Sequence, residues 1–558
     1  MIIFLIWVVV LIAVLVLYLR QVYSRFSRYG IKFIRPVPLL GNMSPILFRV
    51  DHFAYYILNL YNAFPEERFV GRFEFLNEMV VVRDLELIKK ITVKDFEHFL
   101  DHRTLGSDSM IGRSLFFLKG QEWKDMRSTL SPAFTSSKIR LMIPFMVDVG
   151  DEMIETLRMK IKASKGKLTN VDCKDLTTRY ANDVIASCAF GLKVNSHTEV
   201  DNQFYTMGKA ATNFNFRQVI KFFLLVNMPI VIKRPKKFFR NLVLDTMKDR
   251  ELRHIIRPDM IHLLMEAKKG KLSHEDVQSN DAAAGFATVE ESSVGQRELN
   301  RVWQDNDLVA QAVLFLVAGF ESVSSSMTFL MYELAVNPDV QERLAQEVKE
   351  HDIKNGGKFD FTSIQNMTYM DMVVSELLRK WPTAIVLDRV CNKDYNMGKP
   401  NEKAERDFIL RKGSSVMLPT YAFHHDPEFF PDPEKFDPER FSEENKHKIQ
   451  TLAYMPFGFG PRNCIGSRFA LCELKVMTYQ VLRQMVMSPC ESTRIPAELS
   501  PESFNIRLTT VDWSRIGKNR KFLVYFSNII YFLFEVQDFL LISYTRRMGI
   551  KQEVVQSV

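Results

Sequence analysis

A single cysteine set among glycines constrains the fold of this 558-residue chain more than any other feature. From Phe457 to Gly466 the sequence reads Phe-Gly-Phe-Gly-Pro-Arg-Asn-Cys-Ile-Gly, and a helical pattern follows over Ser467–Leu482. Glycines let a backbone approach a flat ligand closely, and free amides and the helix dipole stabilise a thiolate just before a helix. A buried structural cysteine is the alternative, but Phe, Gly, Arg, Cys and Gly in so short a segment argue against it.

This segment resembles the haem-binding loop of the cytochrome P-450 superfamily. The resemblance implies that Cys464 is the axial thiolate ligand of the iron in haem b, and that Phe457, Arg462 and Gly466 also contact the cofactor. A thiolate ligand pushes electron density onto iron and favours cleavage of bound O–O. The resemblance further implies the fold of that superfamily, which is mainly α with a small β portion behind an N-terminal membrane anchor helix.

A second motif pairs an acid with a base well before the cysteine segment. Glu376 and Arg379 are three residues apart, so they share one face of a helix, although such pairs are usually solvated at a surface. Arg440 follows them in the sequence Pro-Glu-Arg-Phe. In the superfamily the corresponding Glu, Arg and Arg form a buried charge cluster that fixes the cysteine loop. Because a buried charge without its partner is costly, we expect loss of Glu376 or Arg379 to prevent stable haem incorporation.

An apolar helical stretch over about Leu308–Leu334 contains Ala318, Gly319, Glu321 and Ser322. A small Ala-Gly pair makes room beside a helix, and an acid next to a hydroxyl can relay protons. A tight helix crossing with an incidental glutamate is the alternative. The segment resembles the oxygen-activation motif of the superfamily, which implies a catalytic role for these four residues. Ser322 replaces the usual threonine and lacks the methyl that restricts the rotamer, so we expect less tightly gated proton delivery.

Four side chains are candidates for holding the haem propionates. Trp123 and Arg127 are four residues apart, so on a helix they share a face, and an indole N–H and a guanidinium both suit a carboxylate. The resemblance implies that this pair, together with Arg389 and Arg462, meets the propionates. Arg103 is a weaker candidate, because the loop around it is hard to place. Any one of these arginines taken alone could be a surface charge.

The first residues of the chain are strongly apolar. Ile2–Leu19 contains no charge and no proline, and a membrane core needs about twenty such residues. Basic residues follow the run and none precedes it, which places the C-terminal side in the cytoplasm and argues against the alternative, a cleaved secretory signal. We expect a single-pass anchor over residues 1–19, in the endoplasmic reticulum membrane as the resemblance implies. A basic, proline-containing hinge follows over residues 20–42.

Residues 43–508 form the expected monooxygenase domain. Most of this stretch shows helical spacing of apolar residues, with strand-like pieces near Phe69–Phe75 and Met79–Val82. We interpret the pair His424-His425, which precedes Asp-Pro, as structural turn residues rather than metal ligands. Residues 509–558 do not align with the superfamily and form an expected atypical C-terminal extension.

Composition restricts the cellular compartment in which the chain can fold and the classes of molecule that it can bind. The six cysteines are scattered without a CxxC motif, so the folded part is expected in a reducing compartment. The net charge of +8 fits an anionic membrane surface or an acidic protein partner, and no motif indicates nucleic-acid binding. The apolar segment Phe222–Val226 lies beside basic residues, which suits either a loop at the membrane interface or a buried helix with a solvated end.

The resemblance covers about Arg35–Leu508 and is nearest to insect microsomal members associated with oxidation of xenobiotics and plant toxins. It implies a membrane-bound monooxygenase that inserts one atom of O₂ into lipophilic substrates. Electrons come from NADPH through a flavoprotein reductase, with cytochrome b5 as a further candidate partner, because the chain has no dinucleotide or flavin fingerprint. Hydroxylation of an endogenous lipid or hormone is one alternative. A haem-containing but inactive binding protein is another, because of the unaligned C-terminus.

The walls around the haem decide which compound is oxidised, since the haem itself carries the chemistry. Four segments are expected to form these walls: Ser107–Phe117, Phe315–Ser322, Thr383–Leu387 and Ser500–Ile506.

Overall fold

The computed structural model describes most of the chain. The described residues are 2–48, 50–103, 111–164, 169–212, 233–269, 285–289, 294, 303–357, 361–497, 499 and 505–510. The chain divides into two compact units, Met1–Thr509 and Thr510–Val558, and the described helices belong to the first. The segment Phe222–Val226 and residues 511–558 lie outside the described residues, as do 107–110 and 500–504 of the expected pocket walls.

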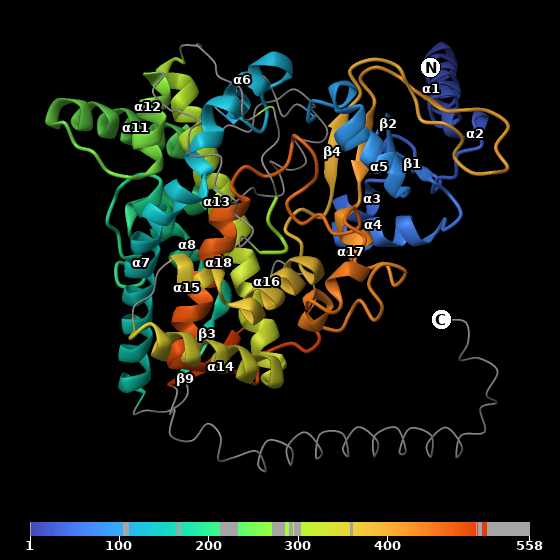
Figure 1. Cartoon of the computed structure of the whole chain (residues 1–558). Helices are drawn as coiled ribbons and strands as arrows, with labels where there is room; N and C mark the ends of the chain where they lie inside the picture. The colour runs from blue at the N-terminus through green and yellow to red at the C-terminus, as the bar shows by residue number, and fades with distance from the viewer. Residues whose placement is uncertain are drawn as a thin grey trace, which may run out of the picture. The chain divides into compact units, whose positions relative to one another are not determined.

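Helices dominate the first unit, and the strands gather into small sheets (Figure 1). The helices are α1 Ile2–Tyr23, α2 Arg25–Arg28, α3 Ser44–Leu47, α4 Phe53–Asn62, α5 Leu85–Lys89, α6 Gly120–Leu130, α7 Ser136–Ala163, α8 Cys173–Cys188, α9 Gln203–Thr212, α11 Lys233–Arg253, α12 Met260–Lys268, α13 Asp305–Val336, α14 Pro338–Lys354, α15 Phe361–Gln365, α16 Thr368–Lys380, α17 Thr420–His424 and α18 Ser467–Gln484. The strands are β1 Phe69–Glu74, β2 Asn77–Val82, β3 Thr169–Asp172, β4 Leu387–Val390, β5 Tyr395–Asn396, β6 Ile409–Leu410, β7 Ser415–Leu418, β8 Met485–Pro489 and β9 Asn505–Thr510. The predicted class, mainly α with a small β portion, is confirmed.

The largest sheet joins the N-terminal part of the body to the segment after α16. Its strand order is β1-β2-β7-β4, and the pairs β1–β2 and β4–β7 are antiparallel whereas β2–β7 is parallel. β1 and β2 lie where the sequence predicts strands, because both segments are rich in β-branched and aromatic residues. In β4 the register pairs Arg389 with Val416 of β7, so the sheet fixes the backbone of one predicted propionate-binding arginine.

The helix α13 runs through the main apolar core and packs against α8, α16 and α18. A capping box between Gln304 and Asp307 fixes its start, and it ends at Val336, slightly beyond the predicted Leu308–Leu334. Its crossing with α8 is close at Gly319, where an added Cβ would lie 2.9 Å from Cδ1 of Ile185.

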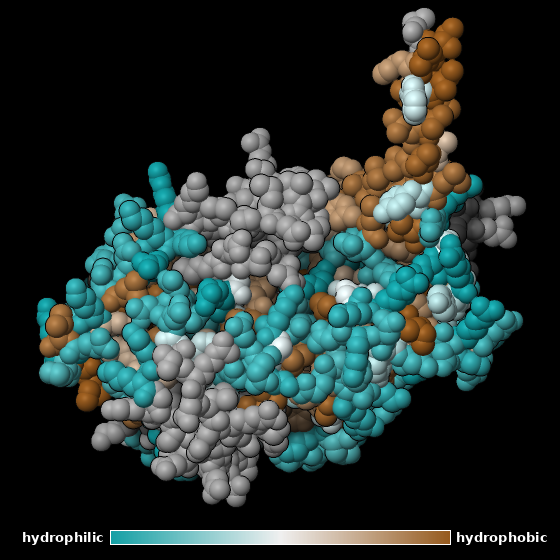
Figure 2. Space-filling view, turned by 90° about the horizontal axis from the view of Figure 1, so that it is seen from above, coloured by the Kyte–Doolittle hydropathy of each residue, from teal (hydrophilic) through white to brown (hydrophobic). Residues whose placement is uncertain are grey.

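The helix α1 fits a membrane anchor. It is long and apolar enough to cross a membrane and is almost entirely exposed, whereas α13, which also passes that test, is largely buried in the core. In Figure 2, α1 stands out as a column of apolar residues. The helix ends at Tyr23, beyond the anchor predicted over residues 1–19.

The segment after α1, where the sequence predicts a hinge, packs on the body. Phe26 in α2 is fully buried, with its ring centroid 4.9 Å from that of Phe73 and 5.9 Å from that of Phe33. A β-bridge also joins Phe33 to Gly71 of β1. The part around Pro36 and Pro38 is not helical, as expected, and burial of Phe26 packs the segment against the sheet.

Candidate active site

Cys464 lies in a loop that closes on itself just before α18. The amide of Cys464 donates to the carbonyl of Phe457 at 2.9 Å, and the amide of Gly458 donates to the carbonyl of Met455 at 3.1 Å. These bonds satisfy backbone groups that would otherwise be unpaired in a turn, so the loop holds its shape from within.

Two glycines make this loop possible. Gly458 and Gly460 adopt φ values of +78° and +74°, in the left-handed region that other residues rarely occupy. A Cβ at Gly460 would also overlap the backbone carbonyl of Thr92, whereas at Gly458 its nearest neighbour would be 3.6 Å away. Gly466 differs from both, because it has φ −92° at the N-cap of α18.

The side chain of Cys464 is accessible even though protein surrounds it, as expected of a group that faces an internal space. Burial raises the pKa of its thiol, and the Gly466 amide and the charge of Arg127 oppose this only in part. Sequence reasoning expected amides and the helix dipole to favour the thiolate, but desolvation outweighs them here. The protein alone therefore favours the neutral thiol, and a metal cation is the partner that would stabilise the thiolate.

The helix α6 is bonded to the two residues that precede Cys464. Trp123 and Arg127 lie on one buried face of this helix, as predicted. Nη1 of Arg127 donates to the carbonyl of Asn463 and Nη2 donates to its Oδ1, both at 2.7 Å. The guanidinium carbon of Arg462 lies 4.3 Å from the ring centroid of Trp123, which is a cation–π contact.

Three arginines gather positive charge beside the loop. Burial lowers the pKa of Arg462 well below its usual value, and the charges of Arg389 and Arg127 lower it further. Burial also lowers the pKa of Arg389 to about 10, which nearby Asp388 offsets only in part. Arg462 donates to three main-chain carbonyls, those of Leu100, Leu115 and Leu118. Because buried cations attract anions strongly, this donor set fits the two carboxylates of haem b.

Arg103, the weaker candidate, belongs to a different set of contacts. Its guanidinium pairs with Glu74, and its amide donates to Oδ2 of Asp388 at 2.8 Å. His102 was missed by sequence reasoning, because no motif marks it. Its Nδ1 lies 3.1 Å from Oδ1 of Asp388, its ring stacks on that of Phe116, and burial lowers its pKa to about 4.

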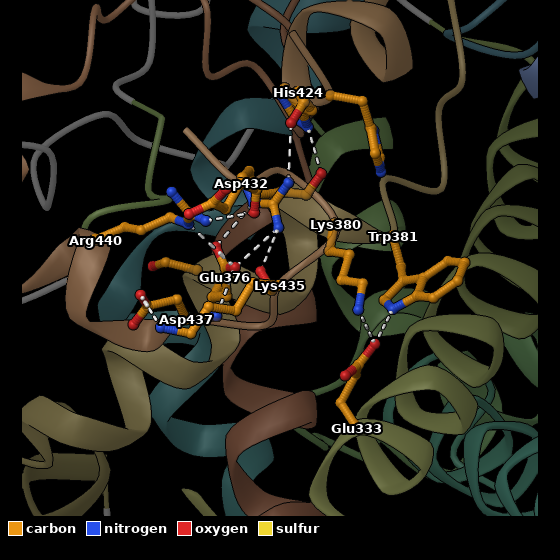
Figure 3. A network of polar contacts seen from close by, with 12 residues as sticks. Glu333, Glu376, Lys380, Trp381, His424, Asp432, Lys435, Asp437 and Arg440 are labelled. Atoms are coloured by element: carbon orange, nitrogen blue, oxygen red, sulfur yellow. Dashed lines mark hydrogen bonds and ion pairs between the residues drawn. The ribbon is translucent and has the colours of Figure 1, made fainter. Parts of the chain in front are cut away.

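Glu376 is the centre of a buried charge cluster (Figure 3). Arg379 donates to both of its carboxylate oxygens, from Nε and from Nη2, each at 2.8 Å, and both side chains are fully buried. Nε of Arg440 lies 3.5 Å from Oε1 of Glu376, and the amide of Asp437 donates to the same oxygen at 2.9 Å. The structure thus brings together the three residues that the sequence singled out.

His424 connects this cluster to the cysteine loop, a role that sequence reasoning did not assign. Its Nδ1 lies 3.0 Å from the carbonyl oxygen of Arg379, and its Nε2 accepts from the amide of Met455 at 3.0 Å. The proton therefore sits on Nδ1, and burial lowers the pKa of His424 to about 3. Since the carbonyl of Met455 accepts from Gly458, hydrogen bonds run from α16 into the loop of Cys464.

The four residues predicted to take part in oxygen activation lie on two different sides of α13. Ala318 is exposed and Ser322, one turn later, is half-buried, and Oγ of Ser322 donates to the carbonyl of Ala318. Glu321 instead reaches α8, where Nζ of Lys174 lies 2.7 Å from its Oε1. Gly319 also faces α8, as the alternative of a tight helix crossing requires.

The described parts of the expected pocket walls include several partly accessible apolar side chains. Phe315 on α13 is half-buried, and its ring centroid lies 5.4 Å from that of Phe134. Residues 384–387 are half-buried, and Phe116 is exposed. Partly accessible apolar side chains of this kind suit a lipophilic ligand.

Comparison with known proteins gives a consistent result. The family model of cytochrome P450 matches residues 35–511. Cytochrome P450 9e2 of Blattella germanica is 43% identical over 90% of this chain and 95% of its own length. Probable cytochrome P450 9f2 of Drosophila melanogaster is 41% identical over 86% and 92%, and probable cytochrome P450 6a13 of the same species is 38% identical over 88% and 93%. The predicted resemblance to insect members is confirmed.

Family membership defines the cofactor and the reaction class. Cytochromes P450 use haem b, which activates O₂ with electrons that NADPH supplies through a reductase. The accessible thiol of Cys464 and the arginines beside it fit that cofactor. The predicted fold, enzyme class and cofactor are therefore confirmed, and the chain belongs to the cytochrome P450 family of haem-thiolate monooxygenases.

Proposed function

We propose that Cys464 binds the haem iron and that its loop supports one face of the haem. The observation that carries this proposal is the accessible thiol of Cys464 in a loop bonded to α6 and, through His424, to α16. Phe457 and Gly466 flank the thiol at the two ends of the loop. Glu376, Arg379 and Arg440 act structurally, by fixing the segment that leads into this loop.

Trp123, Arg127, Arg389 and Arg462 bind the two propionates in this proposal. The argument is electrostatic, since burial lowers the pKa of Arg462 and the neighbouring charges of Arg389 and Arg127 lower it further. Two added carboxylates would reduce this repulsion and accept charge-assisted hydrogen bonds. Arg103 is left out of the set, because it already pairs with Glu74.

On the opposite side, we assign Ala318, Gly319, Glu321 and Ser322 to oxygen activation. The small side chain of Ala318 leaves an accessible surface in the middle of a core helix, and the hydroxyl of Ser322 borders it. Gly319 allows the close crossing with α8 that brings Lys174 to Glu321. Glu321 would take a proton from water, and Ser322 would pass a proton toward that surface.

The proposed substrates are lipophilic xenobiotics or plant toxins, for which the apolar residues 384–387 and Phe315 are suitable walls.

The proposed location is the endoplasmic reticulum membrane, with α1 as a single-pass anchor and the body in the cytoplasm, as the basic residues after α1 indicate. A membrane-bound flavoprotein reductase is the proposed electron donor, with cytochrome b5 as a second donor. Hydroxylation of an endogenous lipid or hormone by the same site is the alternative.

A reduced, carbon-monoxide-bound difference spectrum of the membrane-inserted protein tests the iron ligand. We expect a thiolate-type Soret band from the native chain and its loss in Cys464→Ser. Cys472→Ser is the matched control, since Cys472 is a buried cysteine on α18 outside the loop. A native chain without this band, or a Cys464→Ser variant that keeps it, would refute the proposal.

A second candidate function is a haem protein that binds without oxidising. Two observations favour it: Ser322 hydrogen-bonds within its own helix, and Glu321 is held by Lys174. Turnover with NADPH and reductase, over a panel of lipophilic compounds and endogenous lipids, separates the candidates. Product from foreign compounds supports the main proposal, and product from lipids or hormones alone supports the alternative. A normal thiolate band without product or NADPH oxidation supports the inactive binder.

A further inference from the structure

Arg72 is a buried cation that the proposed reaction leaves unused. It lies in the middle of β1, is 1% exposed and pairs in register with Met79 of β2. Within the described part of the chain its guanidinium donates only to sulfur. Nη2 lies 2.8 Å from Sδ of Met43, Nη1 lies 3.6 Å from Sδ of Met79, and Nε has no hydrogen-bond partner. Because a thioether is a weak acceptor, the donors of this guanidinium are poorly satisfied.

The other buried arginines of the described chain differ from Arg72 in their partners. Each of them donates to at least one oxygen: Arg127 to Asn463, Arg250 to Asp259, Arg379 to Glu376 and Arg389 to the carbonyl of Asp388. The two acids of the β1–β2 hairpin, Glu74 and Glu78, are already paired with other arginines. A buried charge without a counter-ion is costly. An orphan cation of this kind therefore indicates a site for an anion that the described chain does not supply.

Aromatic side chains of α4 enclose the guanidinium. Its carbon lies 5.5 Å from the ring centroid of Tyr56 and 5.8 Å from that of Phe53. The Tyr56 hydroxyl is also buried, and it too has no hydrogen-bond partner among the described residues. Burial raises the pKa of Tyr56, and the charge of Arg72 opposes this only in part, so the hydroxyl keeps its proton and can donate. A guanidinium and a phenol in an aromatic lining suit the anionic end of a lipophilic molecule.

Apolar side chains connect this site to the proposed substrate walls. Tyr56 belongs to an apolar cluster between α4 and the sheet, and Val386, one of the wall residues 384–387, packs against that cluster. Both α3 and α4 lie beside the sheet (Figure 1). Met43 directly precedes α3, a helix of four residues of which none is buried, so this part of the cover is thin. Displacement of Met43 would open the guanidinium of Arg72 to a ligand.

We propose that Arg72 and Tyr56 bind the carboxylate of lipophilic acids, and that such acids are a substrate class of this enzyme. The proposal rests on the proposed function, in which residues 384–387 are substrate walls. The carboxylate would replace Met43 as the partner of Nη2 and would also accept from the Tyr56 hydroxyl, so two charge-assisted hydrogen bonds hold it. The hydrocarbon part would lie along the apolar cluster toward Val386.

Spectral titration of the haem-loaded protein in neutral phosphatidylcholine nanodiscs tests this proposal. The probe is dodecanoate, and dodecanol and methyl dodecanoate are matched neutral ligands. The readout is the dissociation constant from the ligand-induced change in the Soret band. We expect Arg72→Met to weaken dodecanoate by roughly 10- to 100-fold, the range of a hydrogen bond to a charged group. The two neutral ligands should bind the native protein and the variant equally.

Three further variants separate a local contact from a change in net charge. Arg72→Lys, which keeps the charge but loses the planar fork, should recover part of the affinity for dodecanoate. Tyr56→Phe should lose roughly 3- to 10-fold. Arg68→Met removes a charge just before β1, where Arg68 pairs with Asp84, and should leave the constant unchanged. Equal weakening by Arg68→Met and Arg72→Met would make net charge responsible and would overturn the proposal.

Thermal unfolding separates ligand binding from a structural role of Arg72. Because Arg72→Met removes a buried charge without a counter-ion, the variant should unfold at the same temperature as the native protein or at a higher one. Dodecanoate should raise the unfolding temperature of the native protein with concentration, but not that of Arg72→Met. A variant that unfolds at a lower temperature and still binds dodecanoate like the native protein would show that Arg72 supports only the fold.

Phosphatidic acid, added to the nanodiscs, carries similar anionic chemistry on a membrane lipid. Dodecanoate affinity that this lipid leaves unchanged supports the proposal, whereas displacement of dodecanoate would assign the site to a lipid headgroup and overturn it. Failure of the proposed function would instead remove the thiolate band or the spectral response to dodecanol. Dodecanoate that binds no better than dodecanol, in a native protein with a normal thiolate band, would overturn this inference alone.

Discussion

The two sides of the proposed haem site are built on different principles. On the side of Cys464, Glu376 and Arg379 are fully buried, and His424 carries their connection into the loop. On the side of α13, the ion pair of Lys174 and Glu321 is exposed and adjustable. Breaking a fully buried pair leaves a charge in a medium of low polarity, whereas breaking an exposed pair costs little. The first side is suited to hold a ligand in place, and the second is suited to move a proton.

The largest effect is expected from Arg379→Leu, which leaves the carboxylate of Glu376 buried without its partner. We expect a loss of about 3–5 kcal/mol in the free energy of unfolding and little haem incorporation. Urea denaturation and the haem-to-protein ratio measure this. Arg158→Leu is the control, since Arg158 and Glu155 form an exposed pair and its loss should cost about 0–1 kcal/mol. Equal effects of the two variants would break the comparison between buried and exposed pairs.

Gly460→Ala and Gly458→Ala form a matched pair on the cysteine side. Both place an alanine in the left-handed region, at about 1–2 kcal/mol each. Gly460→Ala also forces a Cβ against the carbonyl of Thr92, which should add about 1–3 kcal/mol. Thermal unfolding and the thiolate band should therefore be more affected in Gly460→Ala. If both variants lose the same stability, the contact with Thr92 does not constrain the loop.

Acid should weaken the cysteine side through His424. Its pKa is about 3 in the folded protein and about 6.5 when unfolded, so the unfolded state binds more protons between these values. The contribution of neutral His424 to the free energy of unfolding is complete above pH 6.5 and is lost as the pH falls toward 3. Between pH 7.5 and 5 the loss is about 2 kcal/mol. His102, His197 and His425 shift in the same direction. The pKa of Asp183 is raised to about 6 and partly opposes them.

Urea denaturation between pH 5 and 7.5 measures this dependence. His424→Gln should reduce the slope of unfolding free energy against pH, by about one bound proton at pH 5. His447→Gln, at an exposed histidine, is the control. A slope that stays unchanged in His424→Gln would mean that His424 can be protonated in the folded state.

The smallest effect is expected from Ser322→Thr on the α13 side. The added methyl restricts χ1 but keeps the hydroxyl that donates to Ala318. We expect product per NADPH to rise by roughly twofold, the equivalent of a few tenths of a kcal/mol in rotamer preference. Haem content and unfolding should not change. A loss of haem would show that this residue contributes to holding the cofactor, and the contrast between the two sides would weaken.

The sequence predicts best where a short motif demands its own geometry. The loop around Cys464 needs glycines at fixed positions, and these are visible in the sequence. Trp123 and Arg127 share a face of a single helix, so their spacing was sufficient to predict that they lie together. The fold class and the anchor also followed from local patterns of apolar residues. In Glu376, Arg379 and Arg440 the pairing crosses two segments, and only the resemblance to a family linked them.

Contacts between distant segments were not predictable in the same way. His424 joins Arg379 to Met455 through two ring nitrogens, and a histidine beside another histidine carries no signal of such a role. Lys174 meets Glu321 because α8 and α13 pack against each other, which no local pattern shows. The contact between Phe26 and Phe73 of β1 likewise had no local signal, because the spacing of the prolines says nothing about which ring packs against the sheet.

The burial of Phe26 determines how the body is tied to the bilayer. Only two residues, Ser24 and Arg25, separate the end of α1 at Tyr23 from Phe26, and the three steps along the chain can reach about 10 Å at most. Such a connection is short and allows little independent motion. A rotation of the body would therefore change the tilt of α1. A soluble form of the protein should be cut before Ser24, because a cut at Gly30 would remove Phe26 and open the core behind β1.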